Sequence, residues 1–252
     1  MITIKSKREI ELMRVAGNIV YKTHKYLKKF LKPGITTKKI DDLADKYIRS
    51  LDAIPSCKGY GGFPSAICIS INDEIVHGIA GSRKLEDGDI VTLDICACYK
   101  GYHGDSAWSY CVGEVDEEKK HLMKYTEKSL FIGLEQVKEG NRIGDLSYAI
   151  EKYAKEHNLG VVKEFCGHGI GQNLHEDPEV PNYGIPNTGV RLREGMVIAV
   201  EPMLTAGKPD NYILDNDWTA VTCDGRPAAH FEHTVLVTKD GYEILTGEWK
   251  DG

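Results

Sequence analysis

Apolar residues recur every three or four positions in four stretches of the chain. This spacing places them on one face of a helix. It therefore predicts four amphipathic helices, at residues 7–31, 37–50, 117–138 and 144–157. The first helix is expected to end at Lys32-Pro33-Gly34, because proline and glycine stop helices. Thr36 or Thr37 can cap the second helix, and Asp116 precedes the third.

Shorter apolar runs, bounded by turn residues, lie between and after these helices. Runs of this length predict strands, near 66–71, 74–79, 90–98 and 104–112, and again near 196–205, 217–223, 228–237 and 242–245. A glycine-rich segment precedes each group of strands, CKGYGGFPS at 57–65 and CGHGIG at 166–171. We interpret both segments as loops.

The order helix, helix, glycine-rich loop, strands therefore occurs twice. Two pairs of segments also align, LEDGDIVTLD (85–94) with LREGMVIAVE (192–201) and HGDSAWSY (103–110) with HFEHTVLV (230–237). The pattern predicts an α+β fold made of two pseudo-repeat halves, about 1–113 and 114–252, that share one sheet. No composition shift separates the halves, so we expect residues 1–252 to form a single domain.

The composition is typical of a globular protein, with 41% hydrophobic and 28% charged residues in 252. No apolar run approaches the ~20 residues that span a membrane, and the N-terminal lysines are not followed by the apolar segment of a signal peptide. We therefore expect no membrane segment and a cytoplasmic location.

The seven cysteines are odd in number, which argues against a disulfide framework. Cys96 and Cys98 share a face of a predicted strand; they are interpreted as small buried residues, with a thiolate metal site as the alternative.

The net charge of −6 argues against a large dedicated nucleic-acid surface and against specific DNA binding. One group of lysines is the exception, because its spacing places it on a single face of the first helix. Its members are Lys22, Lys25, Lys29 and Lys32. A solvated surface is the simpler interpretation of this face. A transient electrostatic contact with RNA, for example on a ribosome, is the alternative.

In both aligned pairs of segments an acid faces an acid. Asp94 aligns with Glu201, and Asp105 aligns with Glu232. Asp94 and Glu201 stand in apolar strand runs, where a carboxylate needs a partner or takes up a proton. Basic residues that could pair with them lie nearby but outside these runs, at Arg83, Lys100, Arg191 and Arg193. Because the acids recur at matched positions, we favour a site where four carboxylates converge on a cation.

His168 adds a nitrogen donor, since its flanking glycines leave the imidazole unobstructed. Four carboxylates and one imidazole balance the charge of two divalent ions, and an oxygen-rich set of this kind favours Mn²⁺, Fe²⁺ or Co²⁺ over a thiolate zinc site. Two such ions can activate a water and polarise a carbonyl, which is the chemistry of amide or ester hydrolysis. The segment HEDPE at 175–179 lacks the second histidine of a zincin motif.

Several segments resemble the type I methionine aminopeptidases. They are REIELMRVAG, CKGYGGFPSAICISINDEIVHG, LDI with HGDSAW, CGHGIGQNLHEDPEVPNY, and EPML with FEHTVLVT, and together they span nearly the whole chain. The resemblance implies the pita-bread fold, in which a duplicated central antiparallel sheet is covered by two helix pairs. It is closest to the short, bacterial-style form of the family. The implied activity is removal of the initiator methionine from nascent polypeptides when the second residue is small.

The resemblance also implies roles for individual residues. Asp94 would bind one metal, His168 and Glu201 the other, and Asp105 and Glu232 would bridge both. Glu201 would in addition carry a proton to the departing amine. The metals would be two divalent ions, with Co²⁺, Mn²⁺, Fe²⁺ and Zn²⁺ all acceptable.

Two further histidines and an apolar pocket follow from the same resemblance. His77 would bind the substrate near the scissile amide, and His175 would contact the scissile carbonyl oxygen. The methionine pocket would be lined by Cys57, Tyr60, Phe63, Cys68, Leu174 and Trp218. Phe63 stands where a tyrosine is common in the family, and Leu174 where an aromatic residue is common. For Trp218, an ordinary sheet aromatic is the alternative interpretation.

Three other functions remain open at this point. One is a proline-specific peptidase on the same fold, although such enzymes normally carry an additional N-terminal domain. The others are a metal-free binding protein and a metal-dependent regulator without catalysis. The complete set of five ligands argues against the former, and His77 and His175 argue against the latter. A monomer is the expected state for the family.

Overall fold

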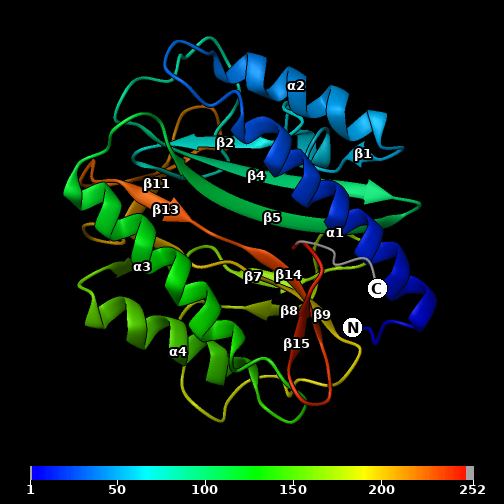
Figure 1. Ribbon diagram of the computed structural model, residues 1–252. Coiled ribbons are helices and arrows are strands. Elements are labelled where there is room, and N and C mark those ends of the chain that lie inside the picture. Colours follow the sequence, from blue (N-terminus) through cyan, green and yellow to red (C-terminus); the bar gives the residue numbers. More distant parts are fainter. Residues whose placement is uncertain (1, 248–252) are drawn as a thin grey trace.

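Two helices cover the strands of each half of the chain (Figure 1). The computed structural model describes residues 2–247. Its four helices are α1 (Lys7–Lys28), α2 (Thr37–Ser50), α3 (Glu117–Leu134) and α4 (Ile143–Glu156). All four predicted helices are confirmed. The mixture of helices with antiparallel strands confirms the α+β class.

Side-chain caps begin three of the helices. Ser6 accepts a hydrogen bond from the backbone N–H of Glu9 in a reciprocal capping box. Thr36 caps α2 through the N–H of Lys39 (3.2 Å), and Asp116 caps α3. The sequence had left open whether Thr36 or Thr37 is the cap. Thr36 fills that position because its extended backbone directs its hydroxyl at the first turn.

Two helices end earlier than predicted. The first ends at Lys28 rather than at 31, because the N–H of Phe30 turns back to the carbonyl of Leu27 at 2.8 Å. The third ends at Leu134 rather than at 138. The prediction that Lys29 and Lys32 lie on the same helix as the other two lysines is therefore wrong, although both side chains are exposed.

The strands form four antiparallel sheets. The first half supplies a four-stranded sheet of β1 (Ile54–Pro55), β4 (Ile90–Tyr99), β2 (Cys68–Ile71) and β5 (Tyr102–Cys111). The second half supplies a five-stranded sheet of β15 (Tyr242–Ile244), β14 (His233–Val237), β9 (Val197–Val200), β7 (Gly167–Gly169) and β8 (Glu176–Val180). Two three-stranded sheets complete the set, with β13 (Ala228–His230), β10 (Met203–Thr205) and β6 (Gly160–Val161) in one, and β11 (Asn211–Ile213), β12 (Ala220–Thr222) and β3 (Glu74–Val76) in the other.

Two predicted strands are each broken in two. The run 196–205 becomes β9 and β10, separated by Glu201 and Pro202, because proline has no N–H to donate to a ladder. The run 228–237 becomes β13 and β14, separated by Phe231 and Glu232. Two of the three predicted metal ligands of the second half, Glu201 and Glu232, thus stand where a ladder is interrupted. The third, His168, lies in β7, so the interpretation of CGHGIG as a loop is wrong.

The two halves are joined along β5 and the break between β13 and β14. The N–H of Glu232 donates to the carbonyl of Ala107 at 2.8 Å. The hydroxyl of Ser106 donates to the carbonyl of Glu232, and that of Thr234 donates to the carbonyl of Asp105, both at 2.7 Å. We call this line of contacts the seam. It joins the two halves by single hydrogen bonds, and the described residues form four separate sheets rather than the one shared sheet that the sequence predicted.

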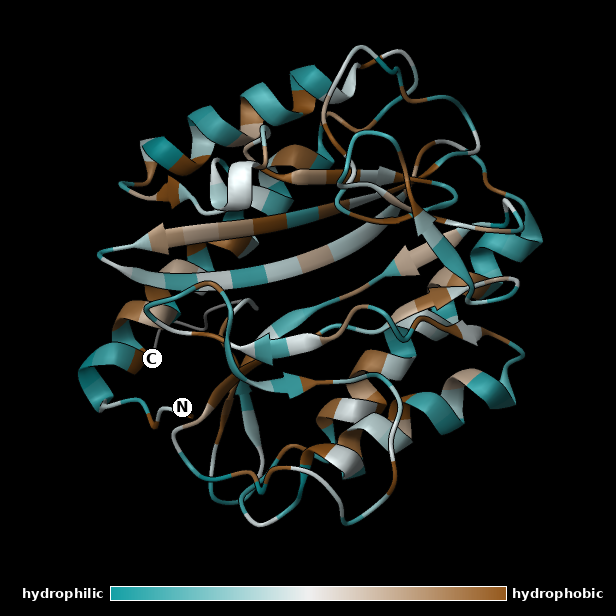
Figure 2. Cartoon of the chain, turned by 180° about the vertical axis from the view of Figure 1, so that it is seen from behind, coloured by the Kyte–Doolittle hydropathy of each residue, from teal (hydrophilic) through white to brown (hydrophobic). Residues whose placement is uncertain are grey.

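Buried apolar residues of α1 and α2 pack with those of β2 and β4 in one cluster, and those of α3 and α4 pack with strands of the second half in another. Figure 2 shows hydrophilic and hydrophobic residues alternating along these helices. One close approach requires glycine. A Cβ on Gly104 of β5 would lie 2.7 Å from the backbone nitrogen of Gly17 in α1, so α1 can rest on β5 only without side chains at this crossing. Within residues 2–247, no helix is both long enough and apolar enough to cross a membrane.

Candidate metal centre

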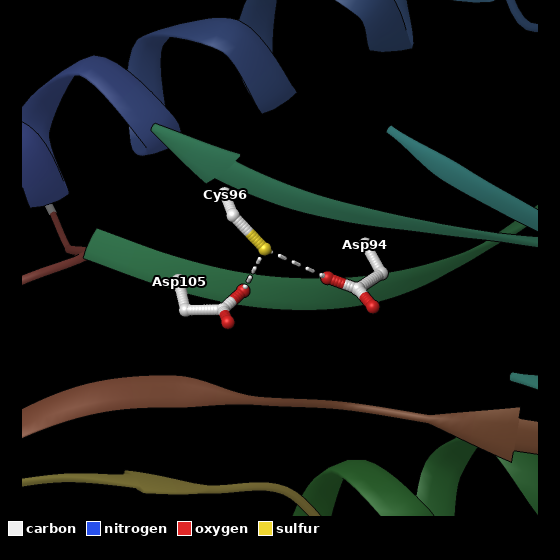
Figure 3. Close-up of side chains that lie close together, drawn as sticks. All are labelled: Asp94, Cys96 and Asp105. Atoms are coloured by element: carbon white, nitrogen blue, oxygen red, sulfur yellow. Dashed lines mark hydrogen bonds between the residues drawn. The ribbon is translucent and has the colours of Figure 1, made fainter. Parts of the chain in front are cut away.

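Three side chains of the first half meet on one face of the β4–β5 hairpin (Figure 3). Asp94 and Cys96 lie two residues apart in β4, and Cys96 is directly opposite Asp105 in β5. The sulfur of Cys96 lies between the two carboxylates, 2.9 Å from Asp105 Oδ1 and 3.7 Å from Asp94 Oδ1. All three offer donor atoms close enough together to hold one metal ion.

The second half brings its donors to the same place across the seam. His168 Nε2, from β7, lies 3.8 Å from Asp105 Oδ2 and 3.6 Å from Glu201 Oε1. Asp105, His168 and Glu232 form a second group with ligand spacing. The structure therefore brings together all five residues that the sequence suggested as ligands, from both halves.

These carboxylates lack cationic side-chain partners. Within residues 2–247 their ion pairs are with histidines, and none is with a lysine or arginine. Burial raises the pKa of Asp94 to about 7 and the pKa of Glu201 to about 8. Burial, followed by repulsion between neighbouring carboxylates, raises the pKa values of Asp105 and Glu232 well above their ordinary values. One oxygen of Glu232, Oε1, is buried without a hydrogen bond from any described residue. Such a cluster needs cations in order to ionise, so the donor set fits divalent metals.

The imidazole of His168 is suited to the ligand role. Burial lowers its pKa to about 4, so the ring is neutral at pH 7 and keeps a lone pair. Its Nδ1 lies 2.9 Å from the carbonyl oxygen of Gly169, which fixes the proton on that nitrogen and leaves Nε2 as the donor to a metal.

Of the two other predicted histidines, His175 lies beside this centre, and His77 meets Trp218 edge to face with ring centres 6.5 Å apart. His77 directly follows β3 with a φ of 59°, in the left-handed region, which costs a residue other than glycine about 1–3 kcal/mol. This strain ends the predicted strand 74–79 at residue 76. The ring of His175 lies 4.2 Å from that of His168, centre to centre, and its Nδ1 lies 2.7 Å from the hydroxyl of Tyr60.

The predicted pocket residues lie beside the ligands. Cys57, Phe63, Cys68 and Leu174 are buried in one apolar cluster that also contains Cys96, and Trp218 packs against it. Phe63 and Trp218 meet edge to face at 5.1 Å. Cys68 is directly opposite Asp94 in the β2–β4 ladder, which places the cluster against the metal centre. Tyr60 is exposed and lies outside this cluster, with its ring centre 5.1 Å from that of His175.

Sequence reasoning missed two residues of the site. Cys96 had been interpreted as a small strand residue, although its position two residues after Asp94 placed it on the same face. His230 is the last residue of β13 and has ligand spacing with Glu201 and Glu232. The available signal was its place in the aligned segment HFEHTVLV, two residues before Glu232.

Residues 11–239 match the model of metallopeptidase family M24. Methionine aminopeptidase 1 of Bacillus subtilis (strain 168) is 52% identical over 246 residues, which cover 98% of this chain and 99% of that relative. The crystal structure of methionine aminopeptidase from Rickettsia prowazekii is similar to this chain with a TM-score of 0.97 at 41% identity, covering 98% and 100% of the two chains.

A second class of peptidase shares the fold. Xaa-Pro dipeptidase from Bacillus anthracis is similar with a TM-score of 0.79 at 24% identity, over 98% of this chain and 63% of that one. At this identity the likeness shows the pita-bread fold alone. The identity to methionine aminopeptidases is much higher and extends over both halves of the chain. The chain therefore belongs to the methionine aminopeptidases of metallopeptidase family M24.

Proposed function

We propose that this metallopeptidase removes the N-terminal methionine of nascent polypeptides with two divalent ions held at the seam. The observation that carries the proposal is the cluster of four carboxylates and a neutral imidazole, without a lysine or arginine partner among the described residues. The ligands are Asp94, Asp105, His168, Glu201 and Glu232. Residues 1–252 would act as one catalytic domain, since each half supplies two of the carboxylates.

The ligands divide between two positions. Asp94 would bind one ion, and His168 with Glu201 the other, while Asp105 and Glu232 would bridge the two. The cluster's distances are compatible with this division, because Asp105 lies near both Cys96 and His168. Ions bound there would polarise the scissile carbonyl and lower the pKa of an attacking water. The donor set accepts Mn²⁺, Fe²⁺, Co²⁺ and Zn²⁺.

Glu201 is suited to move a proton. Burial raises its pKa to about 8 when no ion is bound, and a bound divalent ion would lower that pKa and leave the carboxylate ionised, able to accept a proton from the attacking water. Its side chain remains partly exposed, at 12%. It can therefore reach both the attacking water and the departing amine.

His77 and His175 would position the scissile bond. Burial lowers the pKa of His77 to about 4 and also lowers that of His175, so both rings are neutral at pH 7 and can donate one hydrogen bond each. Tyr60 orients His175 through its Nδ1. We assign His77 to the amide side of the bond and His175 to the carbonyl oxygen.

The apolar cluster beside the metals would accept the methionine side chain. Its thiols and rings, at Cys57, Cys68, Phe63, Leu174 and Trp218, offer the soft, apolar contacts that a thioether prefers. Because Asp94 is opposite Cys68, a side chain in this pocket places its own backbone at the metals. We also propose that the second residue of the substrate is small, as the resemblance to the methionine aminopeptidases implies.

A groove of about 650 Å³ on the α1 side supports a contact with ribosomal RNA. It is lined by Lys22, Lys25 and Lys29 together with several tyrosines, and the rings of Tyr26 and Tyr47 stack at 4.2 Å. Cations with flat aromatic surfaces suit the phosphates and bases of RNA. We place a monomer of this enzyme in the cytoplasm, near nascent chains.

Peptide hydrolysis tests the proposal. The protein is stripped with a chelator and offered Met-Gly-Met-Met or an Xaa-Pro peptide, with and without Mn²⁺, Co²⁺ or Fe²⁺. Release of methionine that depends on added metal is the expected result. Absence of turnover with every metal would refute catalysis, and preference for the Xaa-Pro peptide would assign the enzyme to the other class.

A further inference from the structure

His230 is a buried imidazole whose ring forms no hydrogen bond. It is 2% exposed, and neither Nδ1 nor Nε2 is hydrogen-bonded to any described residue. Its backbone is fixed from the other half of the chain, because its N–H donates to Ser109 Oγ and its carbonyl accepts from the same hydroxyl. The backbone of His230 is therefore held in place, yet its ring nitrogens form no hydrogen bond with the described residues.

The ring faces the metal centre. His230 Nε2 lies 3.4 Å from Glu201 Oε2, and one donor atom from each of His230, Glu201 and Glu232 lies within 4.8 Å of the other two. Glu232 Oε1 also lacks a hydrogen bond. Lone pairs from three side chains thus meet in one small space, and nothing from the described chain donates to them.

Two simpler explanations fit less well. Were His230 a cation paired with Glu201, a charge would be buried with neither ring nitrogen hydrogen-bonded to the described residues, which is costly. Were it a neutral hydrogen-bond donor to Glu201, the contact would have hydrogen-bond geometry, which it lacks. A bound cation satisfies the imidazole nitrogen and both carboxylates at once.

We propose that His230 is a second imidazole ligand of the metal ion bound by Glu201 and Glu232. The inference rests on the proposed metal centre and adds a donor to its five ligands. That position then has two nitrogen donors, His168 and His230, whereas the position at Asp94 has none. Imidazole suits Fe²⁺, Co²⁺ and Zn²⁺ better than Mn²⁺, so His230 would make the two positions differ in ion preference.

Proton NMR of the Co²⁺ form tests this directly. Each imidazole bound to Co²⁺ gives its own paramagnetically shifted ring N–H signal. The stripped full-length protein is titrated with Co²⁺ under anaerobic conditions. We expect two such signals in the wild-type protein and one in His230→Gln, which keeps a neutral polar side chain. Loss of a residue that only supports a metal ligand typically lowers metal affinity about 10–100-fold. Loss of a ligand should lower Co²⁺ affinity at least as much, and Mn²⁺ affinity should fall less.

His233→Gln is the matched control. His233 is also buried, lies three residues further along the chain, and bonds Thr246 through its Nδ1 outside the site. Its replacement should leave both signals and the Co²⁺ affinity unchanged. If His230→Gln fails to fold, His230→Ala with added free imidazole provides the second arm, and restoration of the second signal by imidazole is expected.

Three results would overturn the proposal in distinguishable ways. A single imidazole signal in the wild-type protein with Co²⁺ bound would remove His230 from the ligands but leave the five-residue centre intact. Identical signals in the wild-type protein and His230→Gln would do the same. Failure of the wild-type protein to bind Co²⁺ would refute the metal centre itself.

Discussion

Replacing Asp94 by asparagine should stabilise the protein when metals are absent and destabilise it when they are bound. The substitution keeps the shape of the side chain and removes its charge. In the metal-free fold, burial raises the pKa of Asp94 from 3.8 to about 7. Its ionisation therefore opposes folding, whereas asparagine does not ionise.

The magnitude follows from this pKa. When folding raises the pKa of a group, the contribution of that group to the free energy of unfolding is fully present below its unfolded pKa. This stabilisation is lost as the pH rises through the folded pKa. Between pH 5 and pH 7 the unfolded aspartate is ionised and the folded one is largely protonated. Each pH unit then costs about 1.4 kcal/mol, so the advantage of Asp94→Asn should grow by about 2–3 kcal/mol. For a chain of this size that corresponds to about 4–12 °C in Tm.

Thermal unfolding of both proteins at pH 5, 6 and 7 measures the effect, after chelator treatment and again with saturating Mn²⁺. Burial also lowers the pKa values of buried histidines such as His24 and His168 from 6.5 to about 4, so they too change the stability over part of this pH range. They are common to both proteins, and their effect is removed by taking the difference. With Mn²⁺ bound, wild type should be the more stable protein, because it keeps the ligand.

The reasoning fails if the stripped proteins differ by the same amount at every pH. That result would mean that Asp94 is ionised in the metal-free fold and is balanced by a group other than a metal. Equal stability of the two proteins with Mn²⁺ bound would remove Asp94 from the ligands.

Three further substitutions test other parts of the structure. His77→Ala should lower kcat by about 100-fold while the metal content, measured by atomic emission, stays at the wild-type level; unchanged turnover would exclude His77 from the mechanism. Glu232→Ala should weaken metal binding at least 10-fold in equilibrium dialysis, and full occupancy in that variant would contradict a bridging role. Gly78→Ala should lower the free energy of unfolding by about 1–3 kcal/mol in urea titrations, because its Cβ would lie 2.0 Å from a backbone oxygen of β2. Gly81→Ala is its control, since a Cβ there meets open space, and equal losses in the two variants would show that the close approach is not the cause.

Much of the fold was predictable because its signals are local. Helix periodicity and caps act within a few residues, and the matched acids in two aligned segments indicated that the two halves would bring carboxylates to one site. Strand breaks were harder to predict. Residues 196–205 look like one apolar run despite Glu201 and Pro202. Where that run is interrupted depends on which ladder the neighbouring residues join. The edge strand β8 was also missed, since its proline and charged residues are typical of loops.

Only those residues of the site whose type is unusual at their position in the sequence could be predicted. A carboxylate in an apolar strand is conspicuous in a sequence, whereas a cysteine or a histidine there has common structural explanations. Cys96 became part of the site because antiparallel register placed it opposite Asp105. His230 became part of it because β13 ends beside Glu201, a long-range contact that no local pattern encodes.

The seam also determines how the molecule could be divided. Each half contributes two of the four carboxylates, and the backbone of one half is bonded to the other through Glu232 and Ala107. If the chain were cut between residues 113 and 114, the two fragments would bring like charges together whenever they met. A divalent ion bound between the carboxylates would replace that repulsion by attraction, so the two fragments should associate more tightly when metal is present. Fragment association measured with and without Mn²⁺ would show it, and association indifferent to metal would mean that apolar packing alone holds the halves together.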